Sequence, residues 1–170
     1  GNSPAFVVSH YELASYGELG LYCVLGLFAG LIAVLFVKIL YKTEDIFDAI
    51  NIHWLLKAAI GGLLLGLVGM YHSEVHGVGY GVIEEILNNP GQYGVIILSL
   101  LCVLKIIMTS VTIGAGGSGG VFAPSLFMGA ALGGLFGICV QGIPYFGIAS
   151  PGAYALVGMS AVVAGTTHAP

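Results

Sequence analysis

The sequence predicts an all-α integral membrane protein, and three observations support this fold class. Of the 170 residues, 58% are hydrophobic and only 7% are charged, whereas a soluble domain carries about 25% charged residues. After Glu85, the only formally charged side chain is that of Lys105. Several apolar runs are long enough to cross roughly 30 Å of hydrocarbon as helices. This composition cannot supply the polar exterior that a soluble domain needs.

We expect one domain over residues 1–170 with five membrane-embedded segments. They cover approximately residues 19–41, 54–70, 93–113, 121–140 and 152–170, and the last is cut short by the end of the chain. The first contains 19 consecutive uncharged residues, which is about the length of a membrane-spanning helix. Trp54 is expected to act as an interfacial anchor at the start of the second. A short apolar run at residues 82–87 is too short to span.

The segment between the first two spans, residues 38–57, is predicted to be a loop on the cytoplasmic side. It contains Lys38, Lys42 and Lys57, which are three of the four cations of the chain. Cytoplasmic loops carry an excess of lysine and arginine, and lysines at helix ends can extend their ammonium groups into the interface. The absence of arginine and the net charge of -4 argue against binding to nucleic acid.

Small residues recur four positions apart in the apolar runs. The sets are Gly26 and Gly30, Gly62 and Gly66, and Gly129, Gly133 and Gly137. Close backbone approach at small residues is a main source of helix association in lipid. The three sets together predict a tightly packed helix bundle, although glycine is also simply commoner in membrane helices.

The stretch "SVTIGAGGSGGVFAPSLFMGAALGG", residues 110–134, contains two formal enzyme motifs. A dinucleotide site would need a strand before the glycines and an acid about 20 residues after them. The preceding apolar run is too long for a strand, and no acid follows Glu85. A hydrolase using Ser118 would need an acid and then a histidine downstream. His168 is present but the acid is absent, so we expect no enzyme and keep the Ser118 hydrolase as an alternative.

The same stretch predicts an anion site at the start of a helix. Pro124 suits the first turn of a helix, so we expect the helix to begin between Val121 and Pro124. Unpaired N–H groups and the positive end of the helix dipole attract anions. The glycines at 116, 117, 119 and 120 would leave the backbone accessible to a small ion. A transporter of a cation, the other alternative, would instead call for carbonyls and nearby carboxylates.

These residues resemble a known family. The stretch from Gly120 to Pro124, "GVFAP", resembles the G-x-F-x-P signature of the CLC chloride channels and chloride/proton exchangers. The run-up "KIIMTSVTIGAGGSGG" from Lys105, "HGVGYG" at 76–81 and "GMSAVVAGTTHAP" at 158–170 are also similar to the second half of the transmembrane region of that family. The resemblance implies a partial CLC-type fold with tilted and interrupted helices, one half of an inverted-repeat architecture.

The resemblance also implies the function and the partners. The backbone amides of Val121 and Phe122 would coordinate chloride in the central pore site, within the loop formed with Gly119, Gly120 and Pro124. The parent would be a homodimer in the bilayer that moves chloride, with or without protons, and needs no cofactor or metal. The gating glutamate, the proton-handling glutamate and the pore tyrosine of the family have no counterpart here. The choice between channel and exchanger stays open, and this stretch alone is not expected to transport.

The remaining polar residues receive structural interpretations. Lys105 lies in the middle of an apolar run, where we expect it to snorkel or to bind a backbone carbonyl. His72 and His76, with Glu74 between them, resemble a metal-binding face, but their glycine-rich surroundings favour a solvated loop. Glu84 and Glu85 are expected to be exposed acids near a helix end. The three cysteines lie in apolar runs and are interpreted as small hydrophobic residues.

Overall fold

The computed structural model describes residues 17–75, 77–141 and 149–168, and the regular structure in these ranges is helical. The helices are α1 (Glu18–Ala49), α2 (Trp54–Tyr71), α3 (Tyr80–Asn88), α4 (Gly94–Gly114), α5 (Phe122–Gln141) and α6 (Pro151–Thr167), with short 3₁₀ turns η1 (Ser73–Val75) and η2 (Pro90–Gln92). Within these ranges, α1, α2, α4 and α5 are long and apolar enough to cross a membrane. The predicted fold class is therefore confirmed.

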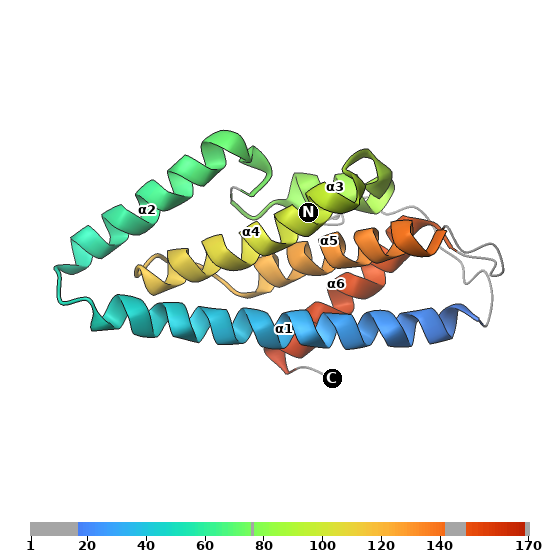
Figure 1. Cartoon of the computed structure of the whole chain (residues 1–170), viewed down its shortest axis with the longest axis horizontal. Helices are drawn as coiled ribbons and strands as arrows, with labels where there is room; N and C mark the ends of the chain where they lie inside the picture. Colours follow the sequence, from blue (N-terminus) through green and yellow to red (C-terminus); the bar gives the residue numbers. More distant parts are fainter. Residues whose placement is uncertain (1–16, 76, 142–148, 169–170) are drawn as a thin grey trace, which may run out of the picture.

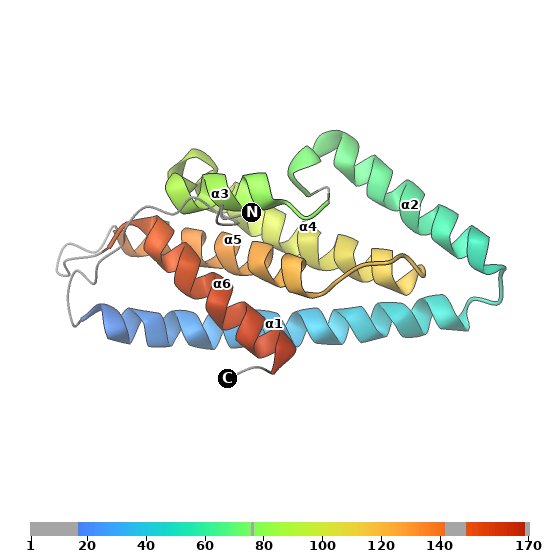
Figure 2. The same cartoon turned by 180° about the vertical axis from the view of Figure 1, so that it is seen from behind.

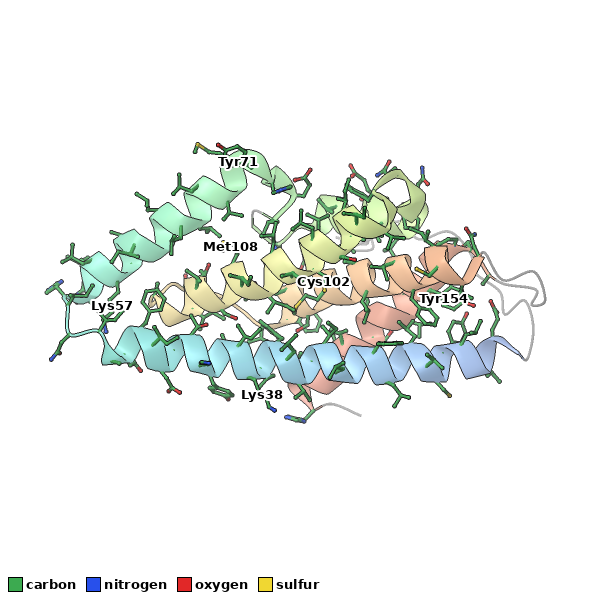
Figure 3. All side chains as sticks on the ribbon, viewed as in Figure 1. Lys38, Lys57, Tyr71, Cys102, Met108 and Tyr154 are labelled. Atoms are coloured by element: carbon green, nitrogen blue, oxygen red, sulfur yellow. The ribbon has the colours of Figure 1, made fainter. Side chains whose placement is uncertain are left out.

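Helices α4 and α5 form an antiparallel hairpin, and this hairpin positions the candidate site (Figure 1). The long helix α1 runs beside it, and α6 crosses obliquely against α5 and α1, as the view from behind shows (Figure 2). Helix α2 diverges from the others, and Tyr71 at its end is 84% exposed and points away from them (Figure 3). The one-sided packing of α2 leaves an apolar surface suited to lipid.

The predicted loop at residues 38–57 is wrong in most of its length, because α1 continues as a helix to Ala49. A 32-residue helix is about 48 Å long, which exceeds the hydrocarbon thickness. No glycine or proline stops the helix, and Leu40 and Phe47 are buried on the same face as Phe36. Lys38 lies on the exposed side (Figure 3). The connection to α2 is therefore confined to residues 50–53, and its cytoplasmic placement stays a prediction.

The predicted close packing at small residues is confirmed for α5. A Cβ atom on Gly129 would lie 2.5 Å from the carbonyl oxygen of Gly158, and one on Gly137 would lie 2.7 Å from the Cα atom of Pro151. A Cβ atom on Gly133 would collide with the backbone of Tyr154. Helices α5 and α6 therefore cross with their backbones in direct contact, and they form the most extensive helix pair in the structure.

The other two glycine sets do not mediate packing in the described structure. These sets lie in α1 and α2 and contain Gly26, Gly30, Gly62 and Gly66. A Cβ atom added at any of these four glycines would meet no atom within 4 Å. The general abundance of glycine in membrane helices accounts for these two sets.

Glu18 connects the start of α1 to the start of α6. Its side chain is fully buried, and its Oε1 atom accepts hydrogen bonds from the backbone N–H of Ala149 and from the hydroxyl of Tyr154, the latter at 3.2 Å. Ala149 directly precedes Ser150, the N-cap residue of α6. The carboxylate therefore lies at the positive end of the α6 dipole, where negative charge is stabilised.

Replacing Glu18 with leucine is expected to lower the free energy of unfolding by about 2–4 kcal/mol, because two buried donors lose their acceptor. Replacing it with glutamine retains an acceptor oxygen of similar reach, so this variant should lose less than half as much. Denaturant titration of the detergent-solubilised protein, followed by circular dichroism, measures both. Equal stability of the leucine variant and the wild type would contradict this role.

Candidate functional site

The first glycines of the Gly-rich stretch end helix α4. Gly116 has a φ of +86°, a left-handed conformation that favours glycine. Its N–H donates to the carbonyl of Ile113 at 2.9 Å, and the N–H of Gly117 donates to the carbonyl of Thr112 at 2.8 Å. This pair of bonds is the Schellman motif, which satisfies the last carbonyls of a helix. Gly116 and Gly117 therefore terminate α4, and their predicted role in exposing the backbone to an ion is not supported.

Helix α5 begins within the predicted window. The N–H of Ser125 donates to the carbonyl of Val121 at 3.1 Å, which is the first turn of the helix. The preceding N–H groups, those of Val121, Phe122 and Ala123, have no intrahelical acceptor, and Pro124 has no N–H. Residues 115–121 separate α4 from α5, so Val121 and Phe122 do not lie within an unbroken helix.

Ser125 fixes the start of α5 against the end of α6. Its side chain is fully buried, and its hydroxyl donates to the carbonyl of Val121 at 2.7 Å. The same hydroxyl lies 2.9 Å from the Oγ1 atom of Thr166. The first turn of α5 is thus linked to the end of α6 by a hydrogen bond between two short side chains.

A cavity of about 300 Å³ lies between the Gly-rich loop and the inner face of α4. Its walls come from α2, the end of η1 and the segment that follows it, α4, the 118–120 loop and the first turn of α5. They are formed by Leu65, Val75, Gly77, Val78, Lys105, Met108, Thr109, Thr112, Ile113, Ser118, Gly119, Gly120, Ala123 and Pro124. The structure therefore brings the predicted loop residues Gly119, Gly120 and Pro124 together with Lys105. Val121 and Phe122 do not line this cavity; the side chain of Phe122 is 57% exposed.

Lys105 is buried in the wall of the cavity, with 2% of its surface exposed. Its Nζ atom donates to the carbonyls of Val75 at 3.0 Å and Gly77 at 2.8 Å, and it lies 4.8 Å from the centre of the Phe127 ring. The expected bond to a backbone carbonyl is confirmed, and snorkelling is wrong because the segment after η1 covers the ammonium. Lys105 thus joins α4, α5 and that segment around the cavity.

Gly79 allows this segment to lie against α5. Its φ is +75°, and a Cβ atom there would lie 2.6 Å from the Cδ2 atom of the fully buried Phe127.

Replacing Gly79 with alanine is expected to lower the free energy of unfolding by about 2–4 kcal/mol, from backbone strain plus overpacking. Gly77, with a φ of +59° and no atom within 4 Å of the added Cβ, is a matched control. Gly77→Ala should cost only the strain, about 1–2 kcal/mol. Melting curves that coincide for the two variants would contradict the contact with Phe127.

The other candidates from the sequence do not form a site. Ser118 is exposed at the cavity, and the described residues of the lining, which exclude His76, contain no histidine or acid that could act as a triad partner. Among the described residues, no group of three or more histidine, cysteine or acidic residues could hold a metal, and His76 lies outside them. Glu84 is half-buried, whereas Glu85 is exposed and accepts a hydrogen bond from the hydroxyl of Tyr93.

Sequence reasoning missed Thr109. It lies one turn after Lys105 on α4, lines the same cavity and is only 9% exposed. Within the described part of the chain its hydroxyl has no hydrogen-bond partner, unlike those of Ser110 and Thr112, which donate to carbonyls four residues back. The four-residue spacing of Lys105 and Thr109 was a signal that they share a helix face.

The fold and this site define a multi-pass helical membrane protein in which the start of one helix lies beside a partly open cavity. The sequence model of the voltage gated chloride channel family matches residues 1–170, and the chain belongs to this family. It is 35% identical over 170 residues to a ClcB-like protein of Ralstonia nicotianae and 36% identical over 183 residues to chloride channel protein CLC-f of Arabidopsis thaliana. It is 33% identical over 164 residues to the H(+)/Cl(-) exchange transporter ClcA of Yersinia pestis.

The comparisons cover most or all of this chain but only part of each relative. The alignments include 100%, 100% and 92% of the chain, in the order given above, and 39%, 23% and 33% of the relatives. The resemblance identified from the sequence motifs is confirmed, and so is the prediction of an integral, multi-pass membrane protein. The relatives are named as channels or transporters, which favours transport over enzymatic activity.

Proposed function

We propose that this chain forms part of a chloride-transporting unit and that the start of α5 supplies backbone donors to the ion. The observation that carries the proposal is the break between α4 and α5, which leaves the N–H groups of Val121 and Phe122 outside regular helical bonding. Gly119 and Gly120 precede them, and a Cβ atom at Gly120 would meet no atom within 4 Å. A small anion can therefore approach the main chain closely. Pro124 supports the first turn of the helix.

The free energies of ion dehydration and of hydrogen bonding show that this helix start cannot bind an ion alone. Dehydrating an ion into a low-dielectric interior costs tens of kcal/mol, whereas one charge-assisted hydrogen bond returns about 1.5–3 kcal/mol. Several donors must therefore surround the ion together. We propose that further donors come from segments outside this chain, in a homodimeric membrane protein that needs no cofactor. The relatives named above include both a channel and a proton-coupled exchanger, so proton coupling stays an open part of the proposal.

Reconstitution of the complete gene product in liposomes tests this function. A chloride gradient should produce an ion flux and a reversal potential that follows the chloride gradient, while a potassium gradient with equal chloride should not. A shift of the reversal potential in a pH gradient would identify proton exchange, and no shift would identify a channel. Flux that follows a cation gradient, or hydrolysis that is lost in Ser118→Ala, would overturn the proposal.

A further inference from the structure

We propose that the cavity lined by Lys105, Thr109 and the 118–120 loop is a second anion site, which holds a small monovalent anion such as chloride beside the start of α5. The inference rests on the proposed function and adds a binding site to it. Val121 and Phe122 do not line this cavity, so its occupant would be separate from an ion held at their amides.

The first observation is a buried positive charge without a counter-charge among the described residues. Lys105 is 2% exposed, and the partners of its ammonium are two carbonyl oxygens and an aromatic ring. These groups are neutral, so they solvate the charge without cancelling it. Glu74 precedes Val75 in the chain and has a buried Oε2 atom without a hydrogen-bond partner in the described structure, and it forms no ion pair with Lys105 there. Buried charges are normally paired, and a bound anion would pair this one.

The second observation is a hydroxyl residue that lines the same cavity and has no hydrogen-bond partner among the described residues. Thr109 is 9% exposed, lines the cavity and makes no hydrogen bond with any described residue. A hydroxyl that makes no intramolecular hydrogen bond can donate to a ligand in the cavity. Such a donor next to a buried ammonium is suited to a ligand that only accepts hydrogen bonds. An anion satisfies both groups at once.

The charge and the size of the rest of the cavity are also compatible with a small bound anion. The described residues of its lining include no acid, and Gly119 and Gly120 leave the backbone of the loop free of side chains. The first turn of α5, represented in the lining by Ala123 and Pro124, contributes the positive end of the helix dipole. A volume of about 300 Å³ is sufficient for a small anion with part of its hydration shell. Retained water lowers the cost of dehydrating the ion when it enters the cavity.

Anomalous diffraction from crystals of the complete gene product soaked in bromide locates such a site directly. We expect one bromide at the start of α5 and another between Lys105 and Thr109. Thr109→Val keeps the shape of the side chain and removes the donor, and Lys105→Gln removes the charge but keeps an N–H donor. Each should weaken binding in the cavity by roughly tenfold or more and leave the bromide at the start of α5 in place. Lys105→Arg should retain both bromides.

Ser110→Ala is the matched control, because Ser110 is a buried hydroxyl residue of α4 that bonds to Ile106 and does not line the cavity. It should retain both bromides. A wild-type crystal with bromide at the start of α5 and none in the cavity would overturn this inference and leave the proposed function intact. An unchanged bromide occupancy in the cavity of Thr109→Val and Lys105→Gln would also overturn it. Absence of bromide at both places, together with absence of chloride flux, would overturn the proposed function itself.

Discussion

Alanine in place of Gly133 is expected to prevent α5 and α6 from packing as they do in the wild type. The added Cβ atom would collide with the carbonyl oxygen of Tyr154 and would lie 2.7 Å from the Cα atom of Ala155. Both are backbone atoms, so no side-chain rotation relieves the contact. Because α5 and α6 form the most extensive helix pair, their separation would propagate through the bundle.

The expected magnitude lies at the upper end of overpacking effects. Insertion of a methyl group into a packed core commonly costs about 1–3 kcal/mol, and more where the backbone must move. We therefore expect Gly133→Ala to lose at least about 3 kcal/mol of unfolding free energy, with greatly reduced accumulation of folded protein in membranes. Size-exclusion profiles and melting curves in detergent measure both effects.

Gly26→Ala is the matched control for this prediction. Gly26 lies within helix α1, and a Cβ atom there would meet no atom within 4 Å. Alanine is favoured over glycine in a helix by about 1 kcal/mol, so this variant should be as stable as the wild type or slightly more stable. Wild-type melting behaviour of Gly133→Ala would show that α5 and α6 can separate without cost, and the description of their crossing would then be wrong.

The helices could be predicted from the sequence because hydrophobic length is a strong signal in membrane proteins. The predicted spans at 54–70, 93–113 and 121–140 differ from α2, α4 and α5 by one residue at their ends. The length of α1 could not be predicted from hydrophobic length, because hydropathy shows where the apolar run ends and the helix continues beyond that point. The buried residues Leu40 and Phe47 carried that information, as a helical stripe that continues among charged residues.

Glycine spacing alone could not identify the contacts between helices. All three sets show the same four-residue repeat, but only the set in α5 faces another backbone. Whether a small residue contacts a neighbour depends on the rotation of its helix relative to the rest of the bundle. Sequence gives this rotation only when one helix face differs clearly from the other. In the apolar parts of α1 and α2, the two sides of each helix are too similar in hydrophobicity to indicate which side faces the bundle.

The candidate site was predicted in part. The start of α5 was expected from Pro124 and the glycines. The separate roles of those glycines, which are either to end α4 or to line the cavity, could be assigned only from the backbone angles and hydrogen bonds of the structure. Gly116 and Gly117 close the end of α4, which leaves Gly119 and Gly120 next to the cavity. The cavity itself could not be predicted, because Gly77 and Val75, whose carbonyls bond to Lys105, lie 28 and 30 residues before it in the chain.

Proline in place of Phe122 is expected to weaken chloride binding to the complete gene product by roughly 10- to 150-fold. Phe122 is the first residue of α5, a position where proline fits the helix and removes only an N–H that has no intrahelical acceptor. The substitution therefore tests a main-chain donor that no ordinary side-chain change can reach. Loss of one charge-assisted hydrogen bond to the ion corresponds to this range of affinity. Titration calorimetry with chloride measures the change.

Phe122→Leu is the control, since it alters a side chain that is 57% exposed and keeps the N–H group. Its chloride affinity should remain within about threefold of the wild type, because a surface side chain away from the donors contributes little to binding the ion. Both variants should melt near the wild-type temperature, because proline is tolerated in the first turn. If the two variants bind chloride equally well, the N–H of Phe122 does not contact the ion. The anion would then have to be held by the neighbouring N–H groups or by the cavity beneath the loop.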